Sequence, residues 1–223
     1  MRSPKPPMKS HTKEGENMHR KDWTRLRALI EERCLKISEK AFKLSTGALS
    51  RYYFDCKNVS LNGEGLSLIA EAFLEEIQKL PEEPTAIGGL TMGADFITAA
   101  VAMKSFERGS HQFEGSIVRK EPKKHGTMNR IENELPRGTP IVVVDDVITT
   151  GNSTKQACEE FQAAGYRIVG IIALIDREEG GKAALEDRFE TKVRAIFSTS
   201  DFPTAIKADE QIRAAKGRIA AAV

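Results

Sequence analysis

The fold of this chain is decided by the run Ile141-Val142-Val143-Val144-Asp145-Asp146-Val147-Ile148-Thr149-Thr150-Gly151-Asn152-Ser153-Thr154. It opens with four β-branched residues and no polar face, as a parallel strand buried on both sides requires. Two carboxylates come next, then a loop rich in hydroxyl groups, and then a helix predicted over residues 153–164. We expect Ser153 and Gln156 to form a capping box and Gly165 to end the helix. The run therefore predicts a strand, loop and helix unit.

Strands and helices alternate on both sides of this unit. Apolar segments predict strands, and apolar residues spaced by three or four predict helices. The expected strands cover residues 48–59, 86–87, 116–118, 168–175 and 193–197, and the expected helices cover 23–37, 66–77, 94–104 and the segment from 203 onward. We expect Asp22 to be the N-cap of the first helix. This alternation indicates an α/β fold with a central, mainly parallel sheet flanked by helices.

The same run predicts a ligand site. In open α/β sheets, ligands bind outside the carboxyl ends of the strands. The loop 149–153 opens into a helix N-terminus, whose free N–H groups suit a phosphate. Asp145 and Asp146 only accept hydrogen bonds, which suits the two hydroxyls of a ribose. The loop has neither Walker A nor GxGxxG spacing. Asp145 and Asp146 could simply end a strand and Ser153 simply cap a helix, but the combined pattern favours a phosphorylated sugar as ligand.

A second concentration of charge lies at residues 119–130. The cations there are Arg119, Lys120, Lys123, Lys124 and Arg130, against the single acid Glu121 and beside His125. Positive charge on a glycine-containing loop suits the neutralisation of a departing pyrophosphate. Taken alone, the segment could also be a solvated loop or a nucleic-acid patch. Beside a sugar-phosphate site, pyrophosphate is the better interpretation.

The composition excludes several classes of protein. The chain has 223 residues, 40% hydrophobic and 30% charged, with a formal net charge of +2. Residues 1–22 hold six basic and three acidic side chains, so the rest of the chain is close to neutral. We therefore expect no nucleic-acid partner. No apolar run is long enough to span a membrane, so we expect no membrane partner either.

Two further expectations concern the tail and the cysteines. Residues 1–21 are basic and proline-containing, and they lack the apolar core of a signal peptide, so we expect a disordered tail. Cys34, Cys56 and Cys158 are far apart and form no CxxC motif. We therefore expect reduced thiols and a cytoplasmic location.

These motifs together resemble the type I phosphoribosyltransferases. Residues 141–154 are similar to the family's signature for phosphoribosyl diphosphate (PRPP). Residues 119–126, Arg-Lys-Glu-Pro-Lys-Lys-His-Gly, are similar to the mobile catalytic loop of the orotate phosphoribosyltransferases, of pattern RKExKxHG. Residues 52–55, 88–95 and 176–179 agree in order. The resemblance covers residues 23–200. It implies a type I phosphoribosyltransferase fold in a single domain over 22–223, with a small N-terminal hood from 22–65.

The resemblance also implies an activity. It indicates the reaction of orotate with PRPP, which gives orotidine 5′-monophosphate and pyrophosphate in de novo pyrimidine (UMP) biosynthesis. The family reaction inverts the anomeric carbon through an oxocarbenium-like state. It implies Mg²⁺ as cofactor, carried mainly by PRPP, with no direct protein ligand and with Asp145 and Asp146 touching its water shell. The implied assembly is a homodimer in which each catalytic loop reaches the neighbouring subunit.

The resemblance assigns roles to particular residues. The implied catalytic residues are Lys120, Lys123, His125, Asp145 and Asp146. The implied PRPP-binding residues are Arg119, Lys120, Lys123, His125, Asp145, Asp146, Val147, Ile148, Thr149, Thr150, Gly151, Asn152 and Ser153. The implied orotate-binding residues are Thr149, Arg177, Tyr53 and Phe54. For three of these a structural role remains an alternative, because Arg177 could form an ordinary salt bridge and Tyr53 and Phe54 could belong to the core.

The chain departs from the family pattern at two positions. Ser45 and Met92 stand where many members have lysine, which removes cations from the orotate and pyrophosphate sites. A phosphoribosyltransferase for a purine or other base is one alternative, and a regulator that senses PRPP without catalysis is another. The basic loop 119–126 argues against both.

Overall fold

The computed structural model describes residues 18–43, 49–109, 112–121, 130–208 and 210. Its centre is a six-stranded sheet of strand order β5-β4-β3-β6-β7-β8. The strands are β3 (Ala86–Leu90), β4 (Glu114–Val118), β5 (Ile131–Glu132), β6 (Pro140–Ile148), β7 (Arg167–Asp176) and β8 (Val193–Ser198). Among the described strands of this six-stranded sheet, only the β4–β5 pair is antiparallel. The expected mainly parallel sheet is confirmed.

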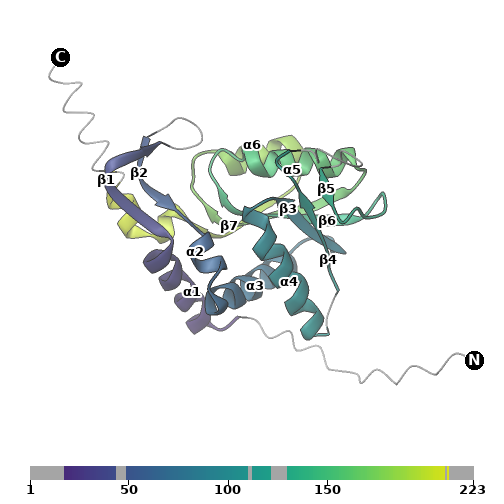
Figure 1. Cartoon of the computed structure of the whole chain (residues 1–223), viewed down its shortest axis with the longest axis horizontal. Helices are drawn as coiled ribbons and strands as arrows, with labels where there is room; N and C mark the ends of the chain where they lie inside the picture. The colour runs from purple at the N-terminus through teal and green to yellow at the C-terminus, as the bar shows by residue number, and fades with distance from the viewer. Residues whose placement is uncertain (1–17, 44–48, 110–111, 122–129, 209, 211–223) are drawn as a thin grey trace, which may run out of the picture.

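Helices cover both faces of the sheet (Figure 1). One face carries α3 (Gly63–Ile77) and α4 (Gly93–Glu107), and the other carries α5 (Asn152–Ala163) and α6 (Gly181–Phe189). Residues 203–208, near the end of the described chain, are also helical, as expected. The structure is therefore the predicted α/β arrangement of three layers.

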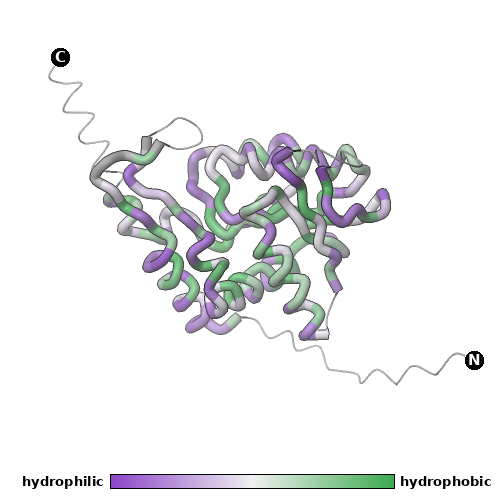
Figure 2. The backbone as a smooth tube through the Cα atoms, in the orientation of Figure 1, coloured by the Kyte–Doolittle hydropathy of each residue, from purple (hydrophilic) through white to green (hydrophobic). Residues whose placement is uncertain are grey.

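The apolar residues of β6 pack alternately into two hydrophobic cores, one on each face of the sheet. Val142 and Val144 pack in the core that contains α3 and α4, whereas Ile141 and Val143 pack in the core that contains α5. Successive residues of a strand point to opposite faces, so a strand covered on both sides needs apolar residues at every position. Figure 2 shows the hydrophobic colour along these central strands.

The N-terminal part forms a separate small layer, which corresponds to the expected hood. It contains α1 (Arg20–Arg33), β1 (Leu35–Lys43), β2 (Leu49–Phe54) and α2 (Lys57–Ser60). β1 and β2 pair in an antiparallel two-stranded sheet, apart from the central one (Figure 1).

Three expectations about this layer are wrong. α1 begins at Arg20 with His19 as its N-cap, so Asp22 lies inside the helix and the expected tail 1–21 overlaps it by two residues. The helix ends at Arg33, and Ile37 pairs with Tyr52 in the two-stranded sheet, because this long-range pairing overrides the local helical spacing. The expected strand 48–59 ends at Phe54 and is followed by α2.

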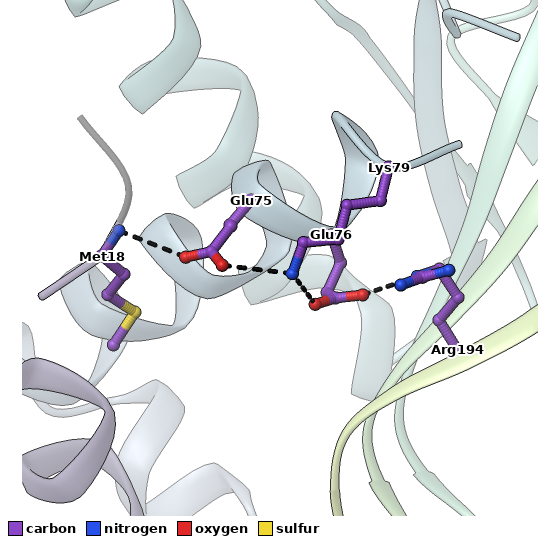
Figure 3. A network of polar contacts seen from close by, with 5 residues as sticks. All are labelled: Met18, Glu75, Glu76, Lys79 and Arg194. Carbon is purple, nitrogen blue, oxygen red and sulfur yellow. Dashed lines mark hydrogen bonds and ion pairs between the residues drawn. The ribbon is translucent and has the colours of Figure 1, made fainter. Parts of the chain in front are cut away.

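A network of polar contacts at the end of α3 joins the start of the described chain to the edge of the sheet (Figure 3). Glu76, in the last turn of α3, accepts hydrogen bonds from Arg194 of β8 at 2.5 Å and from Lys79 at 2.7 Å. The neighbouring Glu75 accepts a hydrogen bond from the main chain of Met18 at 3.1 Å. The network therefore fixes the start of the described chain and the edge strand β8 to the same helix end.

None of the described helices has the length and apolar character needed to cross a membrane.

Candidate active site

A cavity of about 420 Å³ opens at the carboxyl ends of the central strands. Its walls come from the loop after β3 (residues 90–93), the end of β6 with its loop (145–147 and 149–154), and the side chains of Tyr53, Phe54, Lys57, Lys120 and Arg177. β3 and β6 are neighbours, and the chain continues from them in opposite directions across the sheet. The cavity thus lies at the topological switch point, where open α/β sheets bind ligands.

Asp145 is a buried carboxylate that is held from two sides. Its Oδ2 accepts a hydrogen bond from Thr154 Oγ1 at 2.7 Å, and its Oδ1 accepts one from the main-chain N–H of Asp146 at 2.9 Å. Its exposed fraction is 5%. Burial and, next, the negative charge of Asp146 raise the pKa of Asp145 to about 7. The ionised form of Asp145 is therefore unfavourable in the free protein, and any positive charge that enters the cavity would stabilise it strongly.

Asp146 faces the loop after β3. A Cβ on Gly93 would lie 2.6 Å from Asp146 Oδ1 and 3.0 Å from Asp145 Oδ1, so only glycine allows the loop to approach both carboxylates. Burial raises the pKa of Asp146, while the N–H of Val147 and the charge of Lys57 oppose that rise. Both carboxylates lie within β6, which continues to Ile148 beyond the two carboxylates expected to end it, and both line the cavity.

The predicted phosphate loop lies at the start of α5. Gly151 is the N-cap with φ of 80°, a left-handed conformation that favours glycine, and no side chain caps the helix. The expected capping box of Ser153 and Gln156 is therefore wrong, because Ser153 already lies inside the helix. Residues 149–154 line the cavity, so the uncapped first turn and four residues with hydroxyl groups border the ligand space.

Arg177 follows β7 and is 5% exposed. Its Nη2 pairs with Glu179 at 2.9 Å and donates to Ser50 Oγ at 3.3 Å, and its Cζ lies 4.4 Å from the centre of the Tyr52 ring. The Nε atom is buried and has no hydrogen-bond partner in the described structure. The salt bridge expected as an alternative is thus present, yet the guanidinium keeps an unpaired donor in a cavity-lining side chain.

Tyr53 and Phe54 both line the cavity but differ in burial. Phe54 is 2% exposed and packs against Phe202, with ring centres 5.2 Å apart, so it belongs to the core as well as to the cavity wall. Tyr53 is 40% exposed. Alternation along β2 therefore gives one anchored and one accessible aromatic ring.

The basic segment is only partly described. Lys120 lines the cavity, whereas Arg119 pairs with Glu132 at 3.0 Å and Arg130 with Glu160 at 3.0 Å. Lys123 and His125, and Ser45 of the hood, lie outside the described residues. The described part therefore places one of the expected loop cations, Lys120, at the cavity.

The structure brings together most of the other predicted site residues and adds several. Val147 and residues 149–153 line the cavity, but Ile148 is buried in the core beside α5. The sequence reasoning assigned no role to Lys57, Leu90, Thr91, Gly93 or Thr154, which also line the cavity. Thr154 could have been found as the next hydroxyl after Ser153. Lys57 carried no local signal, because its position depends on the pairing of β1 with β2.

Comparison with known proteins agrees with this geometry. The phosphoribosyl transferase domain matches residues 57–207. The orotate phosphoribosyltransferase of Aquifex aeolicus is 42% identical over 163 residues, which cover 73% of this chain and 87% of that protein. The Mycobacterium tuberculosis H37Rv orotate phosphoribosyltransferase in complex with Fe(III) dicitrate superposes with a TM-score of 0.70 at 27% identity, covering 82% of this chain and 99% of that one. Its complex with PRPP gives 0.66 at 26% identity, covering 81% and 98%.

Paired carboxylates and a helix N-terminus at the switch point of such a sheet define the class, and the chain belongs to the phosphoribosyltransferase family with the type I fold expected from its sequence. Within that family its place is among the orotate phosphoribosyltransferases, since the curated relatives of that name match most of their length.

Proposed function

We propose that this protein transfers the phosphoribosyl group of PRPP to orotate and releases pyrophosphate. One observation carries the choice of base. Arg177 lines the cavity that holds Asp145, Asp146 and the phosphate loop, and the buried Nε of its guanidinium has no hydrogen-bond partner in the described structure. An unpaired guanidinium N–H in a buried site favours a ligand with a carboxylate, which orotate carries and the purine bases lack.

Different walls of the cavity bind different parts of the two substrates. The N–H groups of the first turn of α5 and the hydroxyls of Thr149, Thr150 and Ser153 bind the 5′-phosphate. Asp145 and Asp146 accept hydrogen bonds from the ribose hydroxyls. Tyr53, Phe54 and Arg177 hold the base between an aromatic surface and a cation. The diphosphate lies along residues 90–93 and Lys120.

The transfer breaks one bond and forms one. A ring nitrogen of orotate attacks the anomeric carbon of the ribose from the face opposite the diphosphate, so the configuration inverts. The electron pair of the broken C–O bond leaves with the diphosphate, and the ring nitrogen loses its proton. Positive charge develops on the sugar beside Asp145 and Asp146. Their carboxylates stabilise that charge in a site shielded from water.

We also propose that Mg²⁺ accompanies PRPP. Among the described residues, no group of three His, Cys, Asp or Glu side chains could hold a metal ion. Asp145 already accepts two hydrogen bonds and Asp146 accepts one from Val147, so this donor set fits contact through water better than direct ligation. When bound, Mg²⁺ neutralises charge on the diphosphate.

The assembly and location are proposals of the same kind. The similarity of residues 119–126 to the family's catalytic loop supports a homodimer in which Lys123 and His125 reach the partner's cavity. Cys34, Cys56 and Cys158 are free and buried, which is usual in a reducing compartment and supports a cytoplasmic location.

Turnover of different bases tests the proposed function. The purified protein is incubated with PRPP, Mg²⁺ and one base, and base consumption is followed by ultraviolet absorbance. Uracil is the matched control for orotate because it is the same ring without the carboxylate. We expect kcat/KM for orotate to exceed that for uracil by about a thousandfold or more, because uracil leaves the buried donor of Arg177 unpaired. Equal turnover of uracil, or turnover of adenine or hypoxanthine alone, would refute the proposal.

A further inference from the structure

One charged residue in the cavity wall has no part in the proposed reaction. Lys57 is the first residue of α2 and lines the cavity together with Tyr53 and Phe54. Its Nζ pairs with Asp55 Oδ1 at 2.8 Å. The hydrogen bond to Asp55 and, more weakly, the charge of Asp146 raise the pKa of Lys57. Lys57 is therefore a cation whose position beside the ligand space is fixed.

The carboxylate that holds Lys57 is itself shared. Asp55 also pairs with Lys36 of β1 at 2.9 Å, and its main-chain N–H donates to the carbonyl of Cys34 at 2.9 Å. The side chain of Asp55 is 18% exposed. Two ammonium groups thus meet one carboxylate that is anchored to the two-stranded sheet. The cluster keeps a surplus positive charge, and of its two lysines Lys57 is the one that lines the cavity.

The surplus charge faces a particular part of the cavity. The charges of Lys57 and Asp146 act on each other, and Asp146 lies against Gly93 of the loop after β3. α2, which Lys57 begins, is in contact with α4, which Gly93 begins. Met92 in this loop is 53% exposed and brings no charge. An anion bound along residues 90–93 would therefore meet Lys57 as the cation on this side.

We propose that Lys57 is a further substrate-binding residue, whose ammonium contacts the diphosphate of PRPP while Asp55 positions it. The inference rests on the proposed function, because it places the diphosphate along residues 90–93. Lys57 thereby supplies, from the hood, a positive charge that the loop itself lacks at Met92. Residues 53–57 then contribute both to the wall that binds the base and to the wall that binds the diphosphate.

Calorimetric titration of the protein with PRPP, in buffer that contains Mg²⁺ and no base, tests the inference. Three variants are compared with the unaltered protein: Lys57→Met, Lys57→Arg, and the control Lys36→Met, which removes the other partner of Asp55. We expect Lys57→Met to raise the Kd for PRPP about tenfold, as for one lost charge-assisted hydrogen bond. Lys57→Arg and Lys36→Met should stay within about twofold, because both keep a cation at the cavity. Lys57→Met binding PRPP as tightly as Lys36→Met would overturn the inference.

A second ligand locates the contact on PRPP. Ribose 5-phosphate lacks the diphosphate, so its Kd should be the same for Lys57→Met and the unaltered protein, whereas the Kd of inorganic pyrophosphate should rise. Equal weakening of ribose 5-phosphate and PRPP would contradict a diphosphate contact.

The role of Lys57 and the proposed function would be refuted by different results. If the unaltered protein binds PRPP and consumes orotate while Lys57→Met is unchanged, only the role of Lys57 is wrong, whereas absence of PRPP binding by the unaltered protein refutes the proposed function.

Discussion

At the scale of single residues, the buried charge of Asp145 lowers the stability of the folded protein but favours the proposed reaction. A carboxylate buried in the fold beside a second carboxylate is costly to ionise, and its raised pKa of about 7 expresses that cost. The same charge becomes favourable when a cationic sugar occupies the cavity. The fold therefore holds a group that is unfavourable in the free protein and useful in the reaction.

The stability of an Asp145→Asn variant tests this trade. In the unfolded chain Asp145 ionises near pH 4, whereas in the folded chain it keeps its proton to about pH 7. The unfolded state thus binds fewer protons in this window, so the wild type loses stability as the pH rises from about 4 to 7. Relative to wild type, Asp145→Asn should gain up to about 4 kcal/mol between pH 4 and pH 8.

Thermal unfolding at a series of pH values measures the difference. Asp187→Asn is the control, because Asp187 is an exposed carboxylate of α6. The Asp187→Asn variant should lack the gain expected for Asp145→Asn, because Asp187 is exposed. A pH-independent difference between Asp145→Asn and wild type would show that burial of Asp145 has no such effect. The Asp145→Asn variant should also lose transfer activity.

The residues of the site divide into those that local sequence could reveal and those that it could not. Asp145 and Asp146 lie in the carboxyl-terminal part of β6 and the loop 149–153 follows that strand, so a single continuous motif predicted their convergence. Lys57 enters the cavity through the pairing of β1 with β2, and the burial of Ile148 depends on packing against α5. Both depend on how neighbouring elements pack in three dimensions, and side-chain spacing within one segment does not show this.

At the scale of elements, the end of α3 holds the edge strand β8 through Glu76 (Figure 3). Burial alone would raise the pKa of this carboxyl, but hydrogen bonds from Lys79 and Arg194 outweigh it and hold the pKa below its usual range. The pairing therefore contributes stability above the unfolded pKa, and that contribution is lost as the pH falls through the lower folded pKa. This network links the helix layer to the sheet.

Glu76→Gln should destabilise the protein at pH 7 by about 2 kcal/mol, because it weakens the hydrogen bonds to two cations and leaves Arg194 partly unpaired. The loss should shrink below about pH 4, where the wild-type carboxyl also takes up a proton. Urea unfolding at pH 7 and at about pH 3 measures both values. Glu82→Gln is the control, since Glu82 pairs with Arg167 on the surface and should leave the unfolding midpoint unchanged. Equal effects of the two substitutions would contradict a structural role for the Glu76 network.

Element types were more predictable than element boundaries. The strands β3, β4, β6, β7 and β8 and the helices α3, α4 and α5 appear where the sequence placed them, because each is covered on a face that its own residues specify, whereas the two-residue strand β5 was not predicted. The first helix is shorter than predicted because Leu35 and Ile37 pair with Phe54 and Tyr52. The predicted capping box failed because Gly151, with its left-handed φ, already begins α5. Long-range pairing and the backbone conformation of one glycine thus set boundaries that side-chain spacing could not.

At the scale of the whole molecule, the proposed dimer predicts that two damaged subunits restore each other. Lys123→Ala disables the loop and Asp146→Asn disables the cavity, so each variant alone should be almost inactive. If each loop serves the partner's cavity, a mixed dimer has one intact site. Random exchange of equal amounts should therefore recover about a quarter of wild-type activity.

The exchange is made by unfolding and refolding the two variants together, and activity is measured with orotate and PRPP. Each variant refolded alone is the control. No gain on mixing, while size-exclusion chromatography with light scattering shows dimers, would mean that each loop serves its own subunit. A monomer by light scattering would contradict the dimer itself.

The central claim is that this cavity joins orotate to PRPP, and phosphorus NMR of the complete reaction tests it most directly. With orotate, PRPP and Mg²⁺, the account predicts that the PRPP signals are replaced by one nucleotide phosphate and one pyrophosphate in equal amounts. It also predicts that PRPP remains unchanged when orotate is left out. Pyrophosphate release without orotate, or nucleotide formation with a purine base and none with orotate, would contradict the claim.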